Sequence, residues 1–233
     1  MTDQVMPCSV LVDSEARTGH SNMQQDEALL HKVTTDDRQA YVRIYRWSEP
    51  TVSLGYFQKM DDSIDPRIAE CDRVKRITGG GAILHDQELT YSCIVPATHP
   101  VRSNPIQLYE RVHTAIIELL RSMGVAASLR SDVPNGTETA TANEPFLCFL
   151  RSDPRDVVFE GHKIVGSAQR RRRGTILQHG SILLRASPLT PEVVGICDLA
   201  SGFDQSLFSQ QLPERVGRAI STSIDVRIIR DQE

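Results

Sequence analysis

The stretch "GHKIVGSAQRRRRGTILQHGSILL", residues 161–184, has two runs of alternating apolar and polar or small side chains on either side of four consecutive arginines. Alternation with a period of two predicts β-strands, here over 162–169 and 174–184, with a tight turn at the arginine run. The preceding segment, 156–161, is expected to form a third strand that ends in a tight turn. Consecutive strands joined by tight turns predict an antiparallel arrangement.

Further elements are expected along the rest of the chain. Helices are predicted over 21–33, with Ser21 or Asn22 as the cap, and over 104–124. The apolar stripe of the second helix is expected to comprise Ile106, Tyr109, Val112, Ile116, Leu119, Leu120 and Met123. Short helices are expected at 65–72, after Pro191 and near 213–222, and strands at 40–47, 51–57, 73–77, 82–86, 89–96 and 225–230.

This succession of elements predicts an α+β fold, with a mixed, largely antiparallel sheet flanked by helices. Because no repeat or linker is visible, residues 1–233 are expected to form a single domain. The segment 131–144 is polar and poor in apolar residues, so it is predicted to be a mobile loop.

Composition limits the classes of function. A chain of 233 residues with 39% hydrophobic residues is long enough to bury one sizeable core. Its net charge of -4 argues against a non-specific nucleic-acid binder, since such proteins are usually strongly basic. Five widely spaced cysteines without a C-x-x-C pair are typical of a reducing compartment. No signal-peptide pattern and no apolar run near the roughly 20 residues of a membrane span are visible, so a cytoplasmic protein is expected.

The glycine run Gly79, Gly80 and Gly81, in "RITGGGAILHD", is the first candidate for a functional loop. It is either a loose hairpin turn or a loop whose backbone N–H groups approach a ligand closely. The residues alone leave both interpretations open. The chain has no G-x-G-x-x-G or Walker loop, no G-x-S-x-G motif and no His or Cys spacing typical of a metal site, so no metal is expected.

Cys148 and Lys163, fifteen residues apart, form the second candidate. A free cysteine is most often a small buried apolar residue, and a lysine on a strand is most often solvated. Cys148, however, lies at an expected loop-to-strand junction, and Lys163 lies in an apolar segment where a charge needs a partner. Since a cationic amine beside a thiol favours the reactive thiolate, the two residues are either structural or a catalytic pair.

Four segments, 22–30, 45–58, 76–86 and 161–184, resemble a known family. The motif pair R-x-x-G-G-G-A-x-x-H and K-I-x-G-S-A-Q…H-G-S is similar to the biotin/lipoate protein ligase superfamily, in its octanoyltransferase and lipoate-protein ligase branch. The resemblance implies a fold related to class II aminoacyl-tRNA synthetases and biotin synthetases: a mixed sheet with helices on one side and a tunnel for an acyl chain. It also implies that the chain is a single catalytic domain.

Two chemistries exist within this branch. Octanoyltransferases pass an octanoyl or lipoyl group from a carrier-protein thioester to a cysteine and then to a lysine of a lipoyl domain, without a cofactor. Lipoate-protein ligases, the alternative, use ATP and Mg to make lipoyl-AMP. Cys148-Phe149 resembles the Cys-Phe pair of Gram-positive-type octanoyltransferases, and Lys163 follows at a similar spacing, so the transferase is favoured. Cys197, in "GICD", is the rival nucleophile.

The resemblance also implies the other site residues and the partners. With Cys148 and Lys163 as catalytic residues, the expected substrate-binding residues are Arg76, Gly79, Gly80, Gly81, His85, Gly166, Ser167, Ala168, His179 and Gly180. Acyl carrier protein is the expected donor, and the glycine-cleavage H protein or a 2-oxoacid dehydrogenase E2 subunit the expected acceptor; neither nucleic acid nor membrane is expected. Because such partners are generally acidic, docking is expected at the Arg170–Arg173 run, a predicted hairpin tip extended by Arg151 and Arg155.

Overall fold

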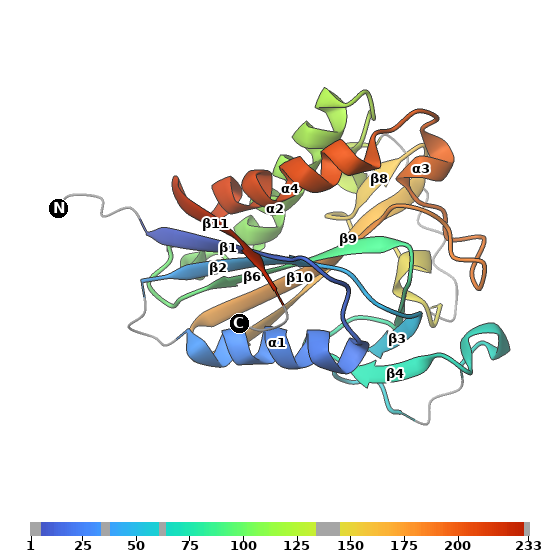
Figure 1. Ribbon diagram of the computed structural model, residues 1–233, viewed down its shortest axis with the longest axis horizontal. Helices are drawn as coiled ribbons and strands as arrows, with labels where there is room; N and C mark the ends of the chain where they lie inside the picture. Colours follow the sequence, from blue (N-terminus) through green and yellow to red (C-terminus); the bar gives the residue numbers. More distant parts are fainter. Residues whose placement is uncertain (1–5, 34–37, 61–63, 134–144, 231–233) are drawn as a thin grey trace.

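The computed structural model describes residues 6–33, 38–60, 64–133 and 145–230 and gathers most of their strands into one large sheet (Figure 1). Eight strands lie in the order β11-β1-β2-β6-β10-β9-β8-β7. Their bounds are Pro7–Asp13 for β1, Ala40–Tyr45 for β2, Glu88–Val95 for β6, Ser128–Leu129 for β7, Val157–Phe159 for β8, His162–Arg172 for β9, Thr175–Leu183 for β10 and Ser223–Ile229 for β11. Strand β1 is parallel to β2 and β11, and the other neighbours are antiparallel, which confirms the predicted mixed, largely antiparallel sheet.

A second, smaller sheet lies beside the first. Its three strands have the order β4-β3-β5, with β3 at Thr51–Leu54, β4 at Asp72–Lys75 and β5 at Ile83–His85. Strand β3 is parallel to β4 and antiparallel to β5. The glycine run therefore connects β4 to β5 at one end of this small sheet.

Helices cover both faces of the large sheet. Helices α2 (Ile106–Ser122) and α4 (Gln205–Ile220) lie against one face, and α1 (Gly19–Lys32) lies against the other (Figure 1). The predicted α+β class is confirmed. The narrower implication of helices on one side of the sheet is wrong, because α1 covers the second face.

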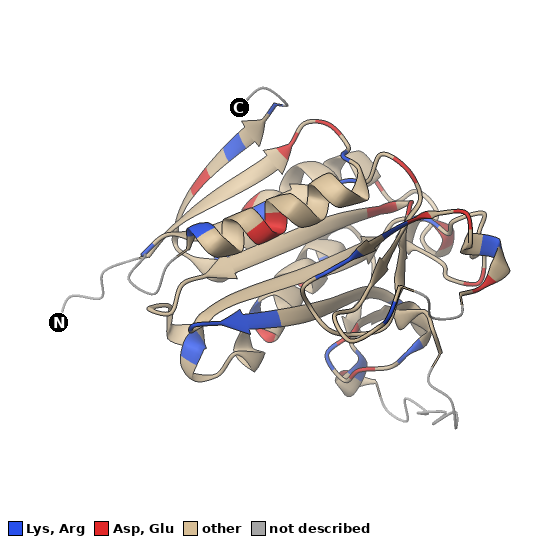
Figure 2. Cartoon of the chain, turned by 90° about the horizontal axis from the view of Figure 1, so that it is seen from below, with Lys and Arg blue, Asp and Glu red and all other residues tan. Residues whose placement is uncertain are grey.

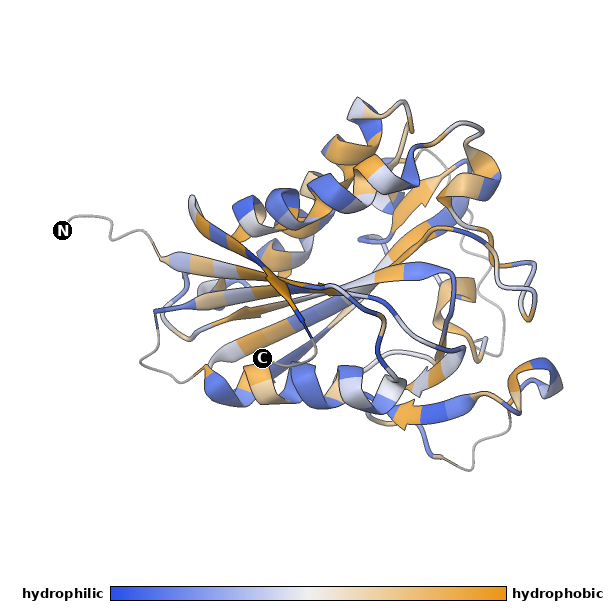
Figure 3. Cartoon of the chain, viewed as in Figure 1, coloured by the Kyte–Doolittle hydropathy of each residue, from blue (hydrophilic) through white to orange (hydrophobic). Residues whose placement is uncertain are grey.

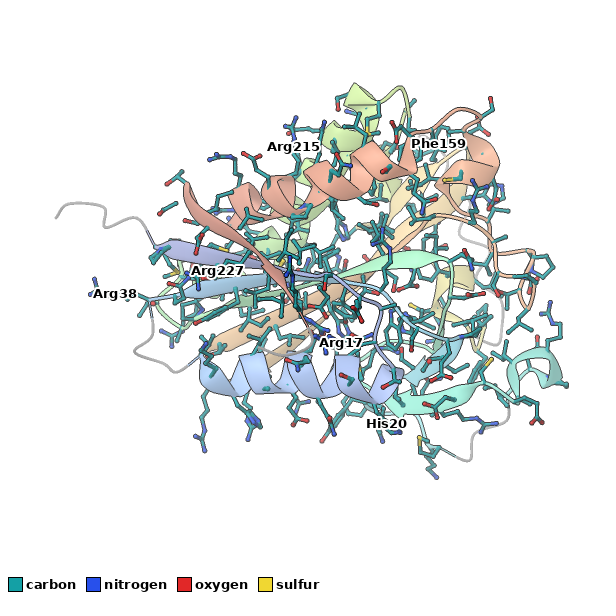
Figure 4. The ribbon with its side chains drawn as sticks, viewed as in Figure 1. Arg17, His20, Arg38, Phe159, Arg215 and Arg227 are labelled. Atoms are coloured by element: carbon teal, nitrogen blue, oxygen red, sulfur yellow. The ribbon has the colours of Figure 1, made fainter. Side chains whose placement is uncertain are left out.

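Strand alternation explains why both faces are covered. Ile94 of β6 and Leu177 of β10 pack against Leu29 and Leu30 of α1, whereas the next residue, Val95, belongs to the core under α2 and α4. Successive strand residues point to opposite faces, so a strand that is apolar at both positions needs cover on both sides. Helix α1 alternates between apolar and polar residues along its length (Figure 3), and side chains fill the space on both sides of the sheet (Figure 4).

Helix α1 begins two residues before its predicted start. The side chain of Thr18 caps it by accepting a hydrogen bond from the backbone N–H of Ser21 (3.3 Å). Asn22 is buried inside the helix, where its amide donates to the carbonyls of Arg17 (3.3 Å) and Arg46 (3.1 Å). The predicted caps are wrong because Thr, Ser and Asn all cap helices well, and only the tertiary structure decides which of them is needed inside.

The other helices also differ from the prediction in detail. In α2 the first stripe residue, Ile106, is 43% exposed, while Leu108 is buried in its place. Helix α4 starts at Gln205, capped by the Asp204 carboxylate, and carries Pro213 in its interior. A start near Pro213 was predicted because proline prefers the first turn; here its missing N–H costs one helix hydrogen bond.

Several short segments complete the fold. The predicted helix at 65–72 is a single 3-10 turn, Pro66–Ile68, and the helix after Pro191 is α3, Ile196–Leu199. Most of the predicted mobile loop, residues 134–144, lies outside the described residues. Within the described part of the chain, no helix is both long and apolar enough to span a membrane.

Candidate active site

A cavity opens among β6, β9, β10, the small sheet and Met23 of α1. Nine of the twelve residues predicted for the site line it: Arg76, Gly80, His85, Cys148, Gly166, Ser167, Ala168, His179 and Gly180. The other three, Gly79, Gly81 and Lys163, lie beside lining residues rather than at the wall. A cavity that collects most of the predicted residues from four separate segments of the chain is the candidate active site.

Cys148 reaches the cavity on a short turn that is fastened to the glycine loop. It begins a 3-10 turn, Cys148–Leu150, and its N–H donates to the carbonyl of Ala82 (2.7 Å). The N–H of Ala82 donates in return to Phe146 (3.0 Å). The predicted feature at Cys148 is a junction between a loop and a strand. The structure has a single β-bridge to Ala82 followed by a 3-10 turn instead, because only one pair of hydrogen bonds joins this segment to Ala82 before the chain turns away.

Lys163 lies next to the Cys148 thiol, as the motif spacing predicts. Its Nζ is 3.9 Å from Sγ of Cys148 and donates to the Cys148 carbonyl oxygen (3.2 Å). The same amine lies 5.3 Å from the centre of the Phe149 ring, a cation–π distance. Lys163 is almost completely buried, so its amine is held beside the thiol in a place that largely excludes water.

Asp156, which the sequence analysis missed, completes this group. Its Oδ1 is 2.9 Å from Nζ of Lys163, and both side chains are 5% exposed. Its Oδ2 accepts the N–H of Asp153 (2.8 Å), which fixes the carboxylate. Burial raises the pKa of Asp156, while Lys163 acts in the opposite direction. The carboxylate thus holds the Lys163 amine against the thiol. In the sequence, Asp156 is visible only as an acidic residue directly before β8, the strand that pairs with the Lys163 strand β9.

Gly166 makes room for the lysine. A Cβ at this position would lie 2.6 Å from Cε and 3.1 Å from Nζ of Lys163, closer than packed atoms allow. A similar reason applies to Gly180, where a Cβ would lie 2.4 Å from Oγ of Ser167. A side chain at either glycine of the second motif would therefore displace a neighbour: the Lys163 amine at Gly166, and Ser167 with the Gly166 carbonyl at Gly180.

The glycine loop is held rigidly by Arg76. The buried guanidinium donates from Nη1 to the carbonyl of Ser53 (2.8 Å) and from Nη2 to the carbonyls of Gly79 (2.8 Å) and Gly81 (2.6 Å). Burial lowers the pKa of Arg76 to about 10. Of the two interpretations left open by the sequence, a loose hairpin turn does not fit a loop that a buried arginine ties to the small sheet.

Gly80 is the residue of this loop that comes nearest to the thiol. Its φ of 94° lies in the left-handed region. A Cβ there would lie 3.0 Å from Nη2 of Arg76 and 4.0 Å from Sγ of Cys148. Its backbone N–H donates to no acceptor among residues 6–33, 38–60, 64–133 and 145–230.

We expect Gly80→Ala to reduce the activity of the site about tenfold, because the new methyl group strains the backbone and pushes into the space between Arg76 and Cys148. The measurement is the rate of acyl transfer beside a thermal melt. Gly124→Ala, which also replaces a glycine with a positive φ but far from the cavity, controls for backbone strain. Equal losses of activity in both variants would mean that the loop acts only through stability.

Two buried histidines form polar walls of the cavity. Nε2 of His179 lies 2.5 Å from Oγ1 of Thr78, and Nδ1 lies 3.5 Å from a carboxylate oxygen of Asp26. Burial lowers the pKa of His179, so the neutral ring accepts from Thr78 and donates toward Asp26. The ring of His85 stacks on Trp47 at 3.8 Å, and both of its nitrogens have partners, Glu88 (2.8 Å) and Ser53 (2.7 Å).

Ser167 is tied to a third histidine that the sequence analysis missed. Its Oγ lies 2.6 Å from Nε2 of His113 and 2.5 Å from the hydroxyl of Tyr91. Burial lowers the pKa of His113 to about 4, so the ring is neutral at pH 7. Nδ1 of His113 donates to the carbonyl of Arg155 (2.6 Å). This network anchors β9 to α2 behind the cavity.

The remaining predicted features lie away from the thiol. Cys197 is in α3, with Sγ 3.7 Å from the side chain of Gln205, and does not line the cavity. The turn predicted at Arg170–Arg173 is shorter than expected. The first three arginines belong to β9, whose basic end is visible in Figure 2, and only Arg173 lies in the turn. Arginines also fit a strand, so the turn falls at the following glycine instead.

Arg151 and Arg155, predicted to extend the basic run, have neighbours of their own in the structure, and their part in docking stays a prediction. Arg155 is paired with Asp153 (2.7 Å), and the Arg151 side chain packs over Gly81 and donates to the carbonyl of Pro145 (2.6 Å). Both arginines are therefore occupied by neighbours. Within the described residues, no group of three His, Cys, Asp or Glu side chains is placed to hold a metal ion.

Known proteins with similar sequences are acyltransferases by name. The family model of the lipoyl protein ligase A/B catalytic domain matches residues 18–214. Octanoyltransferase LipM of Macrococcus caseolyticus is 35% identical over 233 residues, covering 96% of this chain and 80% of that protein. Octanoyltransferase LipM of Anoxybacillus flavithermus is 40% identical over 180 residues, covering 74% of this chain and 64% of that protein. The chain thus spans just under two thirds of the second relative.

Solved structures with the same fold include lipoate ligases. Lipoate-protein ligase A bound with ATP superposes with a TM-score of 0.68 and 21% identity, covering 96% of this chain and 88% of that one. The bipartite lipoate protein ligase of Thermoplasma acidophilum, studied with its E2 lipoyl domain, superposes with a TM-score of 0.67 and 19% identity. This match covers 96% of this chain and 87% of that one. Because these sequence identities are low, the structural similarity shows a shared fold and nothing more. The fold expected from the motif pair is thereby confirmed.

Proposed function

The chain belongs to the lipoyl protein ligase A/B catalytic domain family, and we propose that it is an octanoyltransferase that works through an acyl-Cys148 intermediate. The superfamily predicted from the motif pair is thereby confirmed. Relatives named octanoyltransferase LipM favour octanoyl transfer over the lipoate-protein ligase alternative. The observation that carries the proposal is the position of the Lys163 amine, 3.9 Å from the Cys148 thiol in the wall of a closed-in cavity.

The proposed reaction has two steps that balance without nucleotide. In the first, the Cys148 thiolate attacks the carbonyl carbon of an octanoyl thioester, the bond to the carrier sulfur breaks, and the carrier thiol leaves with a proton. In the second, the neutral ε-amine of an acceptor lysine attacks the acyl-enzyme, the bond to Sγ of Cys148 breaks, an amide forms, and the proton lost by the amine restores the Cys148 thiol. Exchange between thioesters is nearly balanced and amide formation is downhill, so neither ATP nor Mg enters the proposal.

The described side chains have distinct roles in this scheme. Lys163 stabilises the thiolate and lies where negative charge develops on the acyl oxygen, and the N–H of Gly80 is available for the same oxygen. Arg76 keeps the glycine loop in place. The apolar part of the cavity takes the octanoyl or lipoyl chain, in keeping with the mostly apolar character of small-molecule sites.

The proposed donor is acyl carrier protein. The proposed acceptors are lipoyl-domain proteins, including the glycine-cleavage H protein and the E2 subunit of 2-oxoacid dehydrogenases. These partners are the ones that the resemblance to the octanoyltransferase branch implies, and they fit the two steps, which need a carrier thioester first and an accessible lysine second.

The proposal is tested by mixing the protein with octanoyl carrier protein in the absence of nucleotide and measuring its intact mass. An adduct of about 126 Da, the increment of one octanoyl group on a thiol, is expected on the enzyme. Adding a lipoyl domain should then remove the adduct and modify the acceptor. If no adduct forms without nucleotide and acceptor modification requires octanoate or lipoate with ATP and Mg, the ligase alternative holds instead.

A further inference from the structure

The turn that follows β3 exposes a cluster of large apolar side chains beside the active site. Phe57 is 86% exposed, Met60 is 47% exposed and Tyr56 is 43% exposed. The Tyr56 and Phe57 rings meet edge to face with their centres 5.2 Å apart. Contiguous exposed aromatic and Met side chains usually mark an interaction surface, since aromatics and Met are enriched at the centres of interfaces.

This turn is fixed to the glycine loop. The N–H of Tyr56 donates to the carbonyl of Thr78 (2.8 Å), and the N–H of Gln58 donates to Gly55 (2.9 Å). Gly55 packs so tightly that a Cβ would lie 2.0 Å from the carbonyl oxygen of Gly80. The backbone that carries the exposed rings is therefore attached to the same loop that approaches Cys148.

Two cations flank the aromatic cluster. The guanidinium of Arg170 lies 4.5 Å from the centre of the Tyr56 ring, and the Lys75 amine lies 5.8 Å from it. Neither cation pairs with a carboxylate of the described residues, whereas Arg67, Arg155, Arg218 and Arg227 elsewhere on the surface all do. Among the described residues, the cluster thus presents apolar rings together with positive charge that no carboxylate pairs with.

We propose that Tyr56, Phe57, Met60, Lys75 and Arg170, the rim patch, form the docking surface for an acidic protein domain that presents the acceptor lysine. This inference rests on the proposed octanoyl transfer. The positive charge selects an acidic partner, and the exposed rings provide the apolar contact that holds it. A lysine side chain is short, so the acceptor must dock directly beside the loop that carries Gly80, and the rim patch is fastened to that loop.

The experiment isolates the second step. The octanoyl-Cys148 enzyme is prepared with a small octanoyl thioester, and its decay is followed after adding either an acidic lipoyl domain or hydroxylamine. Phe57→Ser and Arg170→Ser should each slow transfer to the domain about tenfold at sub-saturating acceptor, because central aromatic and Arg contacts dominate most interfaces. Decay with hydroxylamine should not change. Ile228→Ser, on the far edge strand and 67% exposed, is the matched control and should behave like wild type.

Salt provides a second readout. Added salt should slow transfer from the wild-type acyl-enzyme to the lipoyl domain and have less effect in Arg170→Ser, since screening acts on exposed charges. If the Phe57→Ser and Arg170→Ser variants react more slowly with both the domain and hydroxylamine, to the same extent, the rim patch shapes the active site. If they react at the wild-type rate with both, the rim patch docks nothing. Either result overturns the proposal. Slower loading from octanoyl carrier protein with unchanged transfer to the domain would assign the patch to the donor and also overturn it. If wild-type enzyme never forms the adduct, the proposed function itself fails.

Discussion

Cys148→Ser is expected to lose the octanoyl adduct and to reduce octanoyl transfer at least about 1000-fold, because a serine hydroxyl without a strong base is a far weaker nucleophile than a thiolate. Cys148 is the only cysteine among the described residues that lines the cavity. The Lys163 amine that would favour a thiolate cannot serve in the same way for a hydroxyl, whose proton is held much more tightly. The measurement is intact mass after mixing with an octanoyl thioester, followed by the rate of acceptor modification.

The other cysteines supply matched controls for this experiment. Cys197→Ser changes a partly exposed thiol outside the cavity and should retain most of the activity and the full adduct. Burial raises the pKa of the Cys8 thiol to about 12, which makes it unreactive at neutral pH. Peptide mapping of the wild-type adduct should locate the acyl group on Cys148. An adduct on Cys197, or a Cys148→Ser variant that still carries one, would refute the assignment of the nucleophile.

The hairpin that carries the lysine could be predicted well from sequence because its alternation is regular. The predicted strands 162–169 and 174–184 correspond to β9 and β10, with bounds that differ by at most three residues. The difference lies in the arginines, which have no apolar alternation and therefore read as a turn. In the structure they extend β9 because their backbone pairs with β10 as far as Thr175.

The helix starts were harder to predict because they depend on tertiary contacts. Thr18 and Asn22 are both good caps, and only the position of the carbonyls of Arg17 and Arg46 draws Asn22 into the interior. Pro213 is a similar case. Local preference places it in a first turn, whereas the core under α4 buries it in the middle of a longer helix.

Two of the three side chains of the proposed catalytic group could be predicted from the sequence. The Cys148–Lys163 pair follows from motif spacing, and the structure brings the two side chains together. The partner of Asp156 is Lys163 on the adjacent strand, and the partner of His113 is Ser167, which is distant in sequence. A single acid or histidine forms no motif with such a partner, so the sequence could not reveal either residue. The requirement for Gly166 was visible as a motif, but its cause, the space taken by the Lys163 side chain, needs coordinates.

The buried carboxylate leads to the second large prediction: Asp156→Asn should reduce acyl-enzyme formation about 100-fold while leaving the protein folded. Asp156 relates to Lys163 as the buried acid of a catalytic triad relates to its base, and replacing such an acid by its amide costs several powers of ten even when the shape is kept. Without the carboxylate, the Lys163 amine loses its 2.9 Å partner and the force that holds it against Cys148. The rate of Cys148 alkylation at neutral pH should fall together with acyl transfer, since both require the thiolate.

The pH dependence separates this role from a structural one. Burial raises the pKa of Asp156, so on acidification the carboxylate protonates, and the ion pair with Lys163 is lost, at a higher pH than for an exposed aspartate. Wild-type activity should therefore fall on the acid side, and that part of the fall should be absent in Asp156→Asn, which has no group to protonate. Asp153→Asn, which removes a nearby carboxylate paired with Arg155 instead, should keep both the activity and the acid fall. Suppose that Asp156→Asn keeps the normal rate of Cys148 alkylation and loses activity at low pH just as the wild type does. The carboxylate would then only stabilise the fold, and the catalytic group would consist of Cys148 and Lys163 alone.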